Sequence, residues 1–358
     1  MIARLLETIA ALPTDGAAAA QDHLDNLTKP PGSLGRLEEI ALRLALVRGG
    51  VPSVAAPVIF TFAADHGVAV EGVSAYPQSV TAQMVENFLR GGAAVNVLAR
   101  QAGARVVVAD FGVASSVPAS PALIVRRIGP GTGNIAVGPA MTRAQAIEAI
   151  EAGARLAEEA IDAGADLLGT GEMGIGNTTA ASAITAAITG AAPEVVTGRG
   201  TGVDDAGWRR KVEVVRRALA VNAPDARDGL GVLATLGGFE IGGLVGVVLA
   251  GAARRVPVAI DGFIAGAAAL IAVTLAPAAR DVLFASHRSA EPGHAAALRH
   301  LGLEPYLDLA MRLGEGTGTA LFIHLARAAA LVWREMATFK SAGVDVRVEP
   351  PSGRRDER

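Results

Sequence analysis

ADLLGTGEMGIGNTTAASAIT, at residues 165–185, begins as a short apolar strand, passes through closely spaced glycines and one glutamate, and continues as a run of helix-forming residues. Asn177, Thr178 and Thr179 are residue types that cap the first turn of a helix, and residues 180–187 favour helix. Free amides at a helix start attract anions, and glycines let a ligand approach the backbone closely. This strand, turn and helix predict a phosphate site.

Glu172 is the unusual residue of this turn. A phosphate group repels a neighbouring carboxylate unless the carboxylate acts on another part of the same ligand. The alternative interpretation is a solvated glutamate in a loop, and the turn alone leaves both interpretations open.

Residues 169–174 also match G-x-G-x-x-G, the pattern of dinucleotide-binding proteins, with Glu194 about 20 residues further on. In that fingerprint the third glycine packs where the helix meets the strand. Here the glycines continue to Gly176, and the helix is expected to begin only at Asn177. An NAD-dependent dehydrogenase is therefore kept as the alternative enzyme class.

The composition of the chain excludes several classes of protein. Its 358 residues form one large α/β domain or two domains. A formal net charge of -3 and an aromatic content of 4% predict neither a basic surface for nucleic acid or acidic lipid nor many rings for base stacking. The sequence has no cysteine, and its first residues lack the pattern of a signal peptide. We expect a cytoplasmic protein with no nucleic-acid partner.

Residues 262–279 carry no charged side chain over 18 residues, a length at the threshold for a membrane-spanning helix. They are mostly alanine and glycine, include Pro277, and follow VPVAID at 256–261, which has the composition of a buried parallel strand. We therefore expect a buried core helix and no contact with a membrane.

Apolar strands alternate with helices from residue 57 onwards. This order predicts an α/β fold with a doubly wound, mostly parallel sheet, which binds ligands at the carboxyl ends of its strands. Besides the strand of the glycine turn, the expected strands are 57–64, 104–110, 256–260 and 281–285. The expected helices in this part are 78–90, 92–102, 142–163 and 204–221, with further helices from 225 to 252.

Both ends of the chain are expected to be helical, at 2–12, 17–27, 33–47 with Ser33 as its cap, and 319–338. Chain termini often lie close together, so these helices predict a small helical subdomain. The expected organisation is an α/β substrate-binding and catalytic domain at 50–318, a helical subdomain from 1–49 and 319–340, and a disordered tail at 341–358.

Other reactive residues give weaker signals. Asp65 and His66 directly follow the strand at 57–64, where an active-site loop is expected. The six histidines form no H-x-H or H-E-x-x-H pair, and His287 and His294 fit no zinc pattern, so no metal site is predicted. No G-x-S-x-G nucleophile elbow occurs.

A second glutamate, Glu315, lies among glycines in LGEGTG at 313–318. Glu172 and Glu315 could converge on one pocket from two loops, whereas the alternative is a glutamate that merely ends a helical turn. Lys211 lies near the start of the helix at 204–221, where it could reach an anion or simply be solvated.

Several segments together resemble one family, the nicotinate-nucleotide:dimethylbenzimidazole phosphoribosyltransferases of cobalamin nucleotide-loop assembly. The resemblance extends from about residue 27 to residue 338, and the combination is far more specific than any single motif. The similar segments, in order, are KPPGSLGRLE, FAADHGVAVEGVSAYPQSVTAQMVENFLRGGAAVN, GTGEMGIGNTTAASA, TGRGTGVDD, FASHRSAEPGH and LGEGTGTAL.

The resemblance implies a Rossmann-like sheet, a homodimer, and transfer of a 5-phosphoribosyl group from nicotinate mononucleotide to 5,6-dimethylbenzimidazole with inversion at C1′. It places the catalytic base at Glu315 and a second active-site carboxylate at Glu172. The residues that it implies for the phosphate are Gly174, Gly176, Asn177, Thr178, Lys211 and Ser289, and those for the acceptor base are Tyr76 and Gln83.

The chemistry of this reaction suits these residue types. The acceptor must lose its N–H proton as it attacks C1′, and a carboxylate in a dry pocket can take that proton. The leaving pyridinium departs as a neutral ring, so neither a metal nor another cofactor is expected. A non-enzymatic nucleotide-binding regulator on the same scaffold is a further alternative, because such a protein would keep its binding function without the glutamates.

Overall fold

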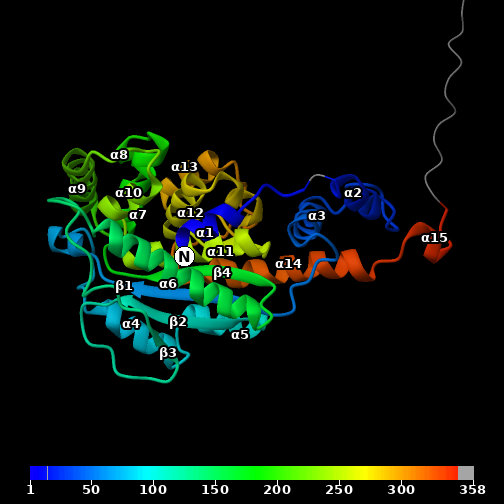
Figure 1. The fold of residues 1–358 in the computed structure, drawn as a ribbon, viewed down its shortest axis with the longest axis horizontal. Helices are drawn as coiled ribbons and strands as arrows, with labels where there is room; N and C mark the ends of the chain where they lie inside the picture. Colours follow the sequence, from blue (N-terminus) through cyan, green and yellow to red (C-terminus); the bar gives the residue numbers. More distant parts are fainter. Residues whose placement is uncertain (14, 346–358) are drawn as a thin grey trace, which may run out of the picture.

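A computed structural model describes residues 1–13 and 15–345 of the chain. Within them, six parallel strands form one sheet in the order β3-β2-β1-β4-β5-β6, with helices around it (Figure 1). The order reverses direction at β1 and β4, which makes the sheet doubly wound. The predicted α/β class and parallel sheet are confirmed. The strands are β1 (Pro57–Ala64), β2 (Arg105–Gly112), β3 (Leu123–Val125), β4 (Leu167–Met173), β5 (Val258–Ile260) and β6 (Leu283–Ala285).

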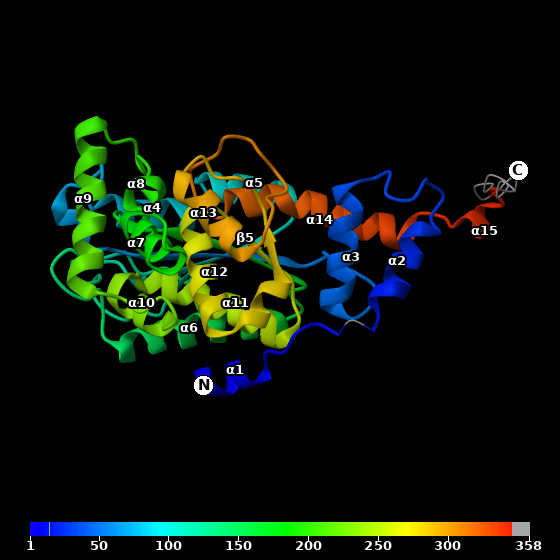
Figure 2. The ribbon, with the colours of Figure 1, turned by 90° about the horizontal axis from the view of Figure 1, so that it is seen from above.

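Two helical layers cover the sheet. α6 and α11 lie together on one side, and α5 and α14 lie on the other (Figure 2). The helices are α1 (Ile2–Thr8), α2 (Ala17–Asp25), α3 (Arg36–Arg48), α4 (Val80–Leu89), α5 (Ala94–Ala102), α6 (Arg143–Asp162), α7 (Asn177–Thr189), α8 (Pro193–Val196), α9 (Asp205–Asn222), α10 (Gly229–Leu236), α11 (Phe239–Arg254), α12 (Phe263–Leu275), α13 (Pro292–Leu301), α14 (Thr317–Glu335) and α15 (Phe339–Ala342), with 3₁₀ turns η1 (Gly67–Glu71) and η2 (Pro277–Val282).

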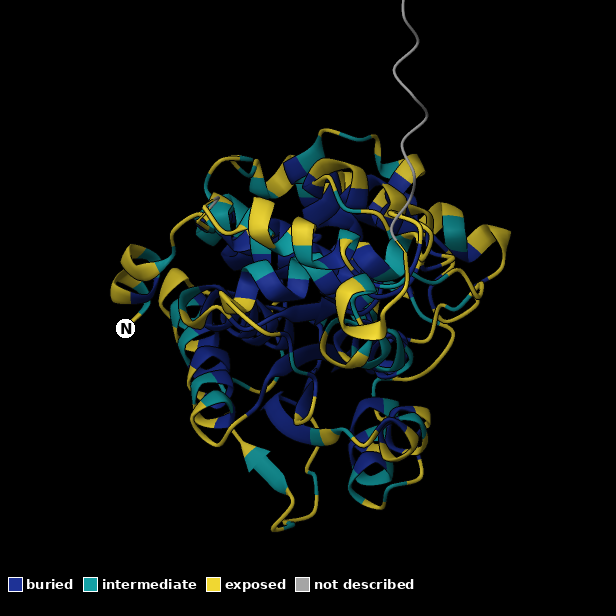
Figure 3. Cartoon of the chain, turned by 90° about the vertical axis from the view of Figure 1, so that its right-hand side faces the viewer, coloured by how far each residue is buried: buried dark blue, intermediate teal, exposed yellow. Residues whose placement is uncertain are grey.

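The core lies between the sheet and these layers. Every residue of β1 is buried, and Figure 3 shows the buried residues gathered at the centre of the molecule. Phe62 of β1 stacks on Phe111 of β2 with 4.4 Å between the ring centroids. A Cβ at Gly243 of α11 would lie 2.7 Å from both rings, so only glycine lets this helix approach the sheet so closely. The many small residues of the sequence thus allow close packing of helix on sheet.

Helix starts follow the sequence in part. Thr142 caps α6 and Asp204 caps α9, and each accepts a hydrogen bond from the backbone amide three residues further on. The expected cap Ser33 was wrong: α3 starts later, its N-cap is Gly35, and no side chain caps it. The chain first makes a turn after the two prolines, which delays the helix.

The structure differs from the predictions at other element boundaries. β3 was not predicted, because a partly exposed edge strand of three residues leaves almost no pattern in the sequence. α1 ends at Thr8 rather than at residue 12. In the segment predicted to be a disordered tail, residues 341 and 342 belong to α15, and residues 346–358 lie outside the described part of the chain.

The helices near the two chain ends pack together in part. α3 packs against α2 and against α14, and an isolated antiparallel bridge joins Leu27 to Thr338. This group extends away from the sheet in Figure 2. α1 is not part of this group, because it contacts α6 and α11 instead.

The uncharged segment after β5 forms α12, and its residues from Phe263 to Ala272 are all buried. The prediction of a core helix is confirmed. Within the described residues, no helix combines the length and the apolar character that crossing a membrane requires.

Candidate active site

The glycine turn joins β4 to α7 at the carboxyl edge of the sheet. Gly176 is the N-cap of α7 and has a φ of +101°, a conformation that glycine adopts without strain. A Cβ at Gly174 would collide with the carbonyl oxygen of Ala64. No side chain caps the helix, and the amides of Asn177 and Thr179 donate to the carbonyl oxygens of Gly174 and Gly176. The positive end of the helix dipole still favours an anion at this turn.

Asn177 and Thr178 have other partners than the helix start. The Nδ2 of Asn177 donates a hydrogen bond to Oε2 of Glu172, and Oγ1 of Thr178 accepts one from Nζ of Lys211 at 2.7 Å. The prediction that these side chains cap α7 was wrong, because Gly176 occupies the cap position. Both side chains therefore bond to other residues of the candidate site rather than to the start of the helix.

Glu172 is a buried residue of β4, with 6% of its surface exposed, and so it is not a solvated loop glutamate. Burial, followed by the negative charges of Asp261 and Glu240, raises the pKa of Glu172 from 4.5 to about 8, while the hydrogen bond from Asn177 opposes the shift. The ligand-free protein therefore holds a proton on this carboxylate at neutral pH.

Glu315 lies in the turn before α14, in which three consecutive residues have positive φ: Gly314 at +88°, Glu315 at +64° and Gly316 at +102°. The left-handed conformation is uncommon for a residue with a side chain, and it persists where the surroundings fix it. Burial raises the pKa of Glu315, with an opposing contribution from the amide of Val95.

Close backbone approaches bring the two glutamates to the same place. A Cβ at Gly314 would collide with Oε1 of Glu172, and a Cβ at Gly171 would collide with the backbone of Glu315. Glycine at both positions therefore allows the turn before α14 to rest on β4. Glu172 and Glu315 both line one cavity.

This cavity has a volume of about 540 Å³ and lies at the carboxyl ends of β4, β5 and β6. Its size suits a mononucleotide and a flat base. Of the predicted site residues it is lined by Tyr76, Glu172, Gly174, Asn177, Thr178, Ser289 and Glu315. Its apolar lining comprises Val80, Met84, Met173, Ile175, Phe263, Ile264 and Leu313, and its remaining lining residues are Gly200, Thr201, Gly262, His287, Glu291, Arg312 and Gly314.

Gln83, which was expected to contact the acceptor, is exposed and does not line the cavity. Successive residues of a helix are about 100° apart, so Gln83 of α4 points away from the face that Val80 and Met84 share. Those two apolar side chains take its place in the wall.

Lys211 lies behind the wall rather than in it. Its side chain is completely buried, and burial lowers its pKa from 10.5 to about 8, with the charge of Glu291 opposing the shift. A Cβ at Gly200 would lie 2.6 Å from Nζ of Lys211 and 2.8 Å from Oγ1 of Thr178. The ammonium group is therefore held between the start of α7 and the loop before α9, and it is not a solvated lysine.

The loop after β6 carries Ser289. Its amide donates to Nδ1 of His294 at 3.0 Å, and its hydroxyl accepts from the amide of Glu291 at 3.2 Å. Burial lowers the pKa of His294 to about 3, so the ring is neutral and can accept this bond. The Oε1 of Glu291 accepts from the amide of Gly200 at 2.9 Å, which ties the loop to the wall near Lys211.

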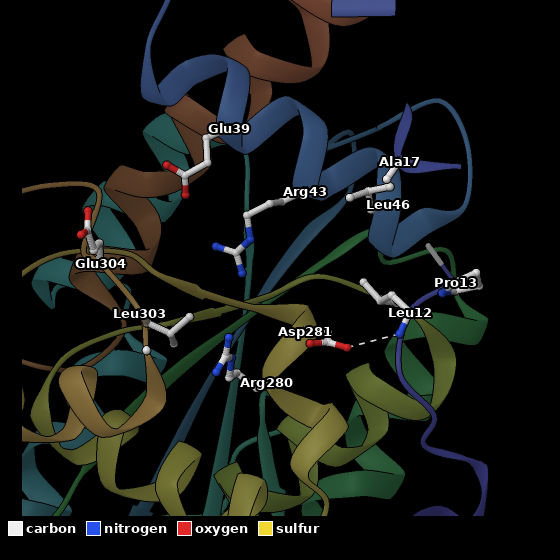
Figure 4. A pocket seen from close by; sticks show the side chains of 11 residues that line it. Leu12, Pro13, Ala17, Glu39, Arg43, Leu46, Arg280, Asp281, Leu303 and Glu304 are labelled. Carbon is white, nitrogen blue, oxygen red and sulfur yellow. Dashed lines mark hydrogen bonds between the residues drawn. The ribbon is translucent and has the colours of Figure 1, made fainter. Parts of the chain in front are cut away.

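A second hollow of about 560 Å³ lies between α3 and the segment around η2. Figure 4 shows Arg43 and Arg280 facing each other across it, with Asp281 hydrogen-bonded to the amide of Leu12. None of the predicted site residues lines this hollow. The cavity beside Glu172 is therefore the candidate active site.

Sequence reasoning missed several polar residues of the site. Asp261, His287, Glu291 and Arg312 lie beside or in the cavity wall. Asp261 could have been found, because a charged residue directly after a buried parallel strand is typical of a site at the carboxyl edge. Within the described residues, no three histidine, aspartate or glutamate side chains are grouped as metal ligands.

Asp65 and His66 follow β1, as expected, but neither lines the cavity. The Nε2 of His66 lies 2.6 Å from Oε1 of Glu240, and both side chains are buried. A Cβ at Gly174 would lie 3.4 Å from that same Nε2. The histidine therefore supports the glycine turn from behind.

Fold and site together define an α/β enzyme with two buried glutamates in one cavity at the carboxyl edge of its sheet. A family model described as a phosphoribosyltransferase matches residues 9–344, and the chain belongs to this family. A relative from Roseiflexus sp. (strain RS-1), named nicotinate-nucleotide-dimethylbenzimidazole phosphoribosyltransferase, is 59% identical over 96% of this chain and 99% of its own length. A relative of the same name from Chloroflexus aggregans is 57% identical over 98% and 99%.

Solved structures are similar as well. The crystal structure of CobT from Thermus thermophilus superposes with a TM-score of 0.89 at 52% identity, over 92% of this chain and 98% of that one.

The dinucleotide alternative is not supported. Gly174 precedes the helix instead of packing inside its first turn, because α7 starts only after Gly176. Glu194, which the fingerprint would place on a ribose, is paired with Arg216 on the surface. The match to G-x-G-x-x-G is therefore accidental.

Substitution of Glu172 should change how stability depends on pH. A folded-state pKa of about 8 against 4.5 means that the folded protein binds the extra proton between these values, so stability is highest at low pH and is lost as pH rises through about 8. For one proton the slope is at most about 1.4 kcal/mol per pH unit. Glu172→Gln should therefore raise Tm more at pH 8.5 than at pH 5.

Thermal unfolding of the ligand-free proteins at both pH values measures this difference. Glu148→Gln, at an exposed position of α6, is the matched control and should leave the pH dependence of Tm unchanged. Parallel Tm curves for wild type and Glu172→Gln would show that Glu172 ionises normally.

Proposed function

We propose that this protein transfers the 5-phosphoribosyl group of nicotinate mononucleotide to 5,6-dimethylbenzimidazole with inversion at C1′. The products are α-ribazole 5′-phosphate and nicotinate, and the first of these serves cobalamin biosynthesis. The observation that carries the proposal is the meeting of two buried glutamates, Glu172 and Glu315, in one cavity that also reaches an uncapped helix start. The names of the relatives agree with this reaction.

The donor phosphate binds at the turn between Gly174 and Thr178. The start of α7 supplies the positive end of its helix dipole to this turn. The Thr178 hydroxyl accepts its hydrogen bond from Lys211, so its own proton remains available for a phosphate oxygen. Ser289 contributes a hydroxyl from the opposite loop.

The acceptor ring lies against the apolar wall that includes Tyr76, Val80 and Met84. One ring nitrogen attacks C1′ with its lone pair, and the bond from C1′ to nicotinate breaks with its electron pair left on the nicotinate nitrogen. The proton of the other ring nitrogen passes to Glu315. Burial of Glu315 brings the pKa of its carboxylate up toward the pH at which a general base works best.

Glu172 acts on the donor rather than on the acceptor. The transition state develops positive charge on the ribose, and an ionised carboxylate stabilises such charge electrostatically. The pyridinium ring of the bound donor also carries positive charge. It therefore favours loss of the proton that Glu172 holds in the ligand-free protein.

Incubation of the purified protein with nicotinate mononucleotide and dimethylbenzimidazole tests the proposal. We expect α-ribazole 5′-phosphate and nicotinate in equal amounts, by chromatography and mass spectrometry. The reaction should proceed in excess EDTA, because the leaving group is a neutral ring and develops no phosphate charge. Binding of the mononucleotide without any turnover would favour the nucleotide-binding regulator.

We also propose that the protein is a cytoplasmic homodimer. Tyr76 and Leu313, two apolar residues of the cavity wall, are 56% and 57% exposed, and a partner subunit could cover them. The family resemblance implies the same state. Light scattering at several concentrations should give twice the 36.2 kDa of one chain.

A further inference from the structure

Asp261 is a buried carboxylate beside the cavity, and the proposed reaction gives it no task. It directly follows β5 and is 1% exposed. Its Oδ1 accepts hydrogen bonds from the amides of Gly318 at 2.7 Å and Thr319 at 3.2 Å. Its Oδ2 accepts one from the amide of Gly316 at 3.2 Å.

These amides belong to the N-cap and first turn of α14, where backbone N–H groups have no partner within the helix. One carboxylate thus satisfies three of them, and its negative charge lies at the positive end of a helix of 19 residues. Glu315 is the residue directly before Gly316 and has a φ of +64°. Asp261 therefore holds the chain at the residue directly after Glu315.

A second contact holds the same turn from the other side. The hydroxyl of Thr61 in β1 donates to the carbonyl oxygen of Glu315 at 2.9 Å. Neither contact involves the carboxylate of Glu315, so both leave it free to react. Together they fix a backbone conformation that a glutamate would otherwise rarely adopt.

We propose that Asp261 is a positioning residue of the phosphoribosyl transfer: it anchors the start of α14 so that Glu315 is presented to the acceptor. This inference rests on the proposed function. Asp261 touches neither substrate in this role and acts through Glu315.

The charged groups around Asp261 agree with this role. Glu172 from β4 and Glu315 from the turn are acidic, and Glu240 from α11 adds negative charge near Glu172. The Nδ1 of His287 lies 3.9 Å from Oδ1 of Asp261, but burial lowers the pKa of His287 to about 4, so the ring is neutral. Burial raises the pKa of Asp261 itself to about 7, while the hydrogen bonds from the amides of Thr319, Gly316 and Gly318 oppose this shift. In its ionised form Asp261 in turn raises the pKa values of Glu172 and Glu315.

Asp261→Asn tests the proposal. Asparagine has one acceptor oxygen, so its NH₂ group must oppose one of the amides of Gly316 and Gly318. A misplacement of about 1 Å can cost roughly 10²-fold in rate, and we expect a loss of about that size in kcat with donor KM nearly unchanged. Removal of the negative charge lowers the pKa of Glu315, so the acidic limb of the kcat profile should move to lower pH.

Asp166→Asn is the matched control. Asp166 is also buried and accepts the amides of Ala55 at 2.6 Å and Ala56 at 2.9 Å, but it lies at the amino end of β4, opposite the site. This variant should lose thermal stability while keeping kcat and its pH profile. Wild-type kcat in Asp261→Asn, or a loss of kcat with an unmoved acidic limb, would overturn the proposal.

Two further measurements keep the test decisive. If Asp261→Asn does not fold, Thr61→Val removes the other anchor of the turn without changing charge, and it should lower kcat with the acidic limb unmoved; full activity would overturn the anchoring. Hydrogen exchange of the amides of Gly316, Gly318 and Thr319 needs no substrate. These amides should exchange faster in Asp261→Asn, and unchanged exchange would overturn the inference even if the wild type formed no α-ribazole phosphate.

Discussion

Glu315→Gln should turn over about 10²–10⁴-fold more slowly than the wild type, which is the range for loss of a general base, and it should bind the donor nearly as well. Glutamine fills the same space but cannot take the acceptor's proton. The acidic limb of the kcat profile should also disappear, because that limb reports protonation of the base. Steady-state kinetics from pH 5 to pH 9 with both substrates varied would measure each effect.

Glu172→Gln is the comparison for this result. It should also slow turnover, through lost stabilisation of positive charge on the ribose, but the acidic limb due to Glu315 should remain. Both side chains are buried to a similar extent, at 6% and 5% exposure, so burial alone does not distinguish the two substitutions. Near-normal turnover of Glu315→Gln at neutral pH would move the role of the base to Glu172.

The sequence predicted those parts of the fold that depend on local pattern. β1 was predicted with its observed bounds, because an almost wholly apolar run of eight residues that begins with Pro57 is typical of a buried parallel strand. The helix expected at 142–163 matches α6 to within one residue at each end, because its apolar spacing is a local pattern. The glycines around Glu172 and Glu315 marked the two turns that meet at the cavity.

What the sequence missed depends on contacts between distant segments. Asn177 looks like a helix cap in isolation, and only the fold reveals that it is bonded to Glu172. Asp261 anchors residues that lie more than fifty positions away, and no local pattern announces such a bond. Gln83 was predicted to contact the acceptor by resemblance alone. Val80 and Met84 line the cavity instead, because they lie on a different face of α4 from Gln83.

Lys211→Met should reduce kcat/KM for the donor by roughly 10²-fold or more. The substitution removes the buried ammonium that attracts the donor phosphate, and loss of one partner of a buried charge pair costs about 2–5 kcal/mol. The wild type should show an alkaline limb in kcat/KM near pH 8, because the pKa of Lys211 is lowered to about 8 and only the charged ammonium attracts phosphate. Because the phosphate is negative, affinity for the donor falls when Lys211 loses its proton, that is, as the pH rises through about 8. The variant should lack the limb.

Arg217→Met separates a local effect from a general loss of positive charge. Arg217 lies on the same helix as Lys211, but it is exposed and paired with Glu71, so its removal changes net charge equally at a distance from the cavity. It should leave donor KM and the alkaline limb unchanged. If both variants raise donor KM equally, or if Lys211→Met keeps the limb, the ammonium does not act on the phosphate. Lys211 would then serve only to hold Thr178 at the start of α7.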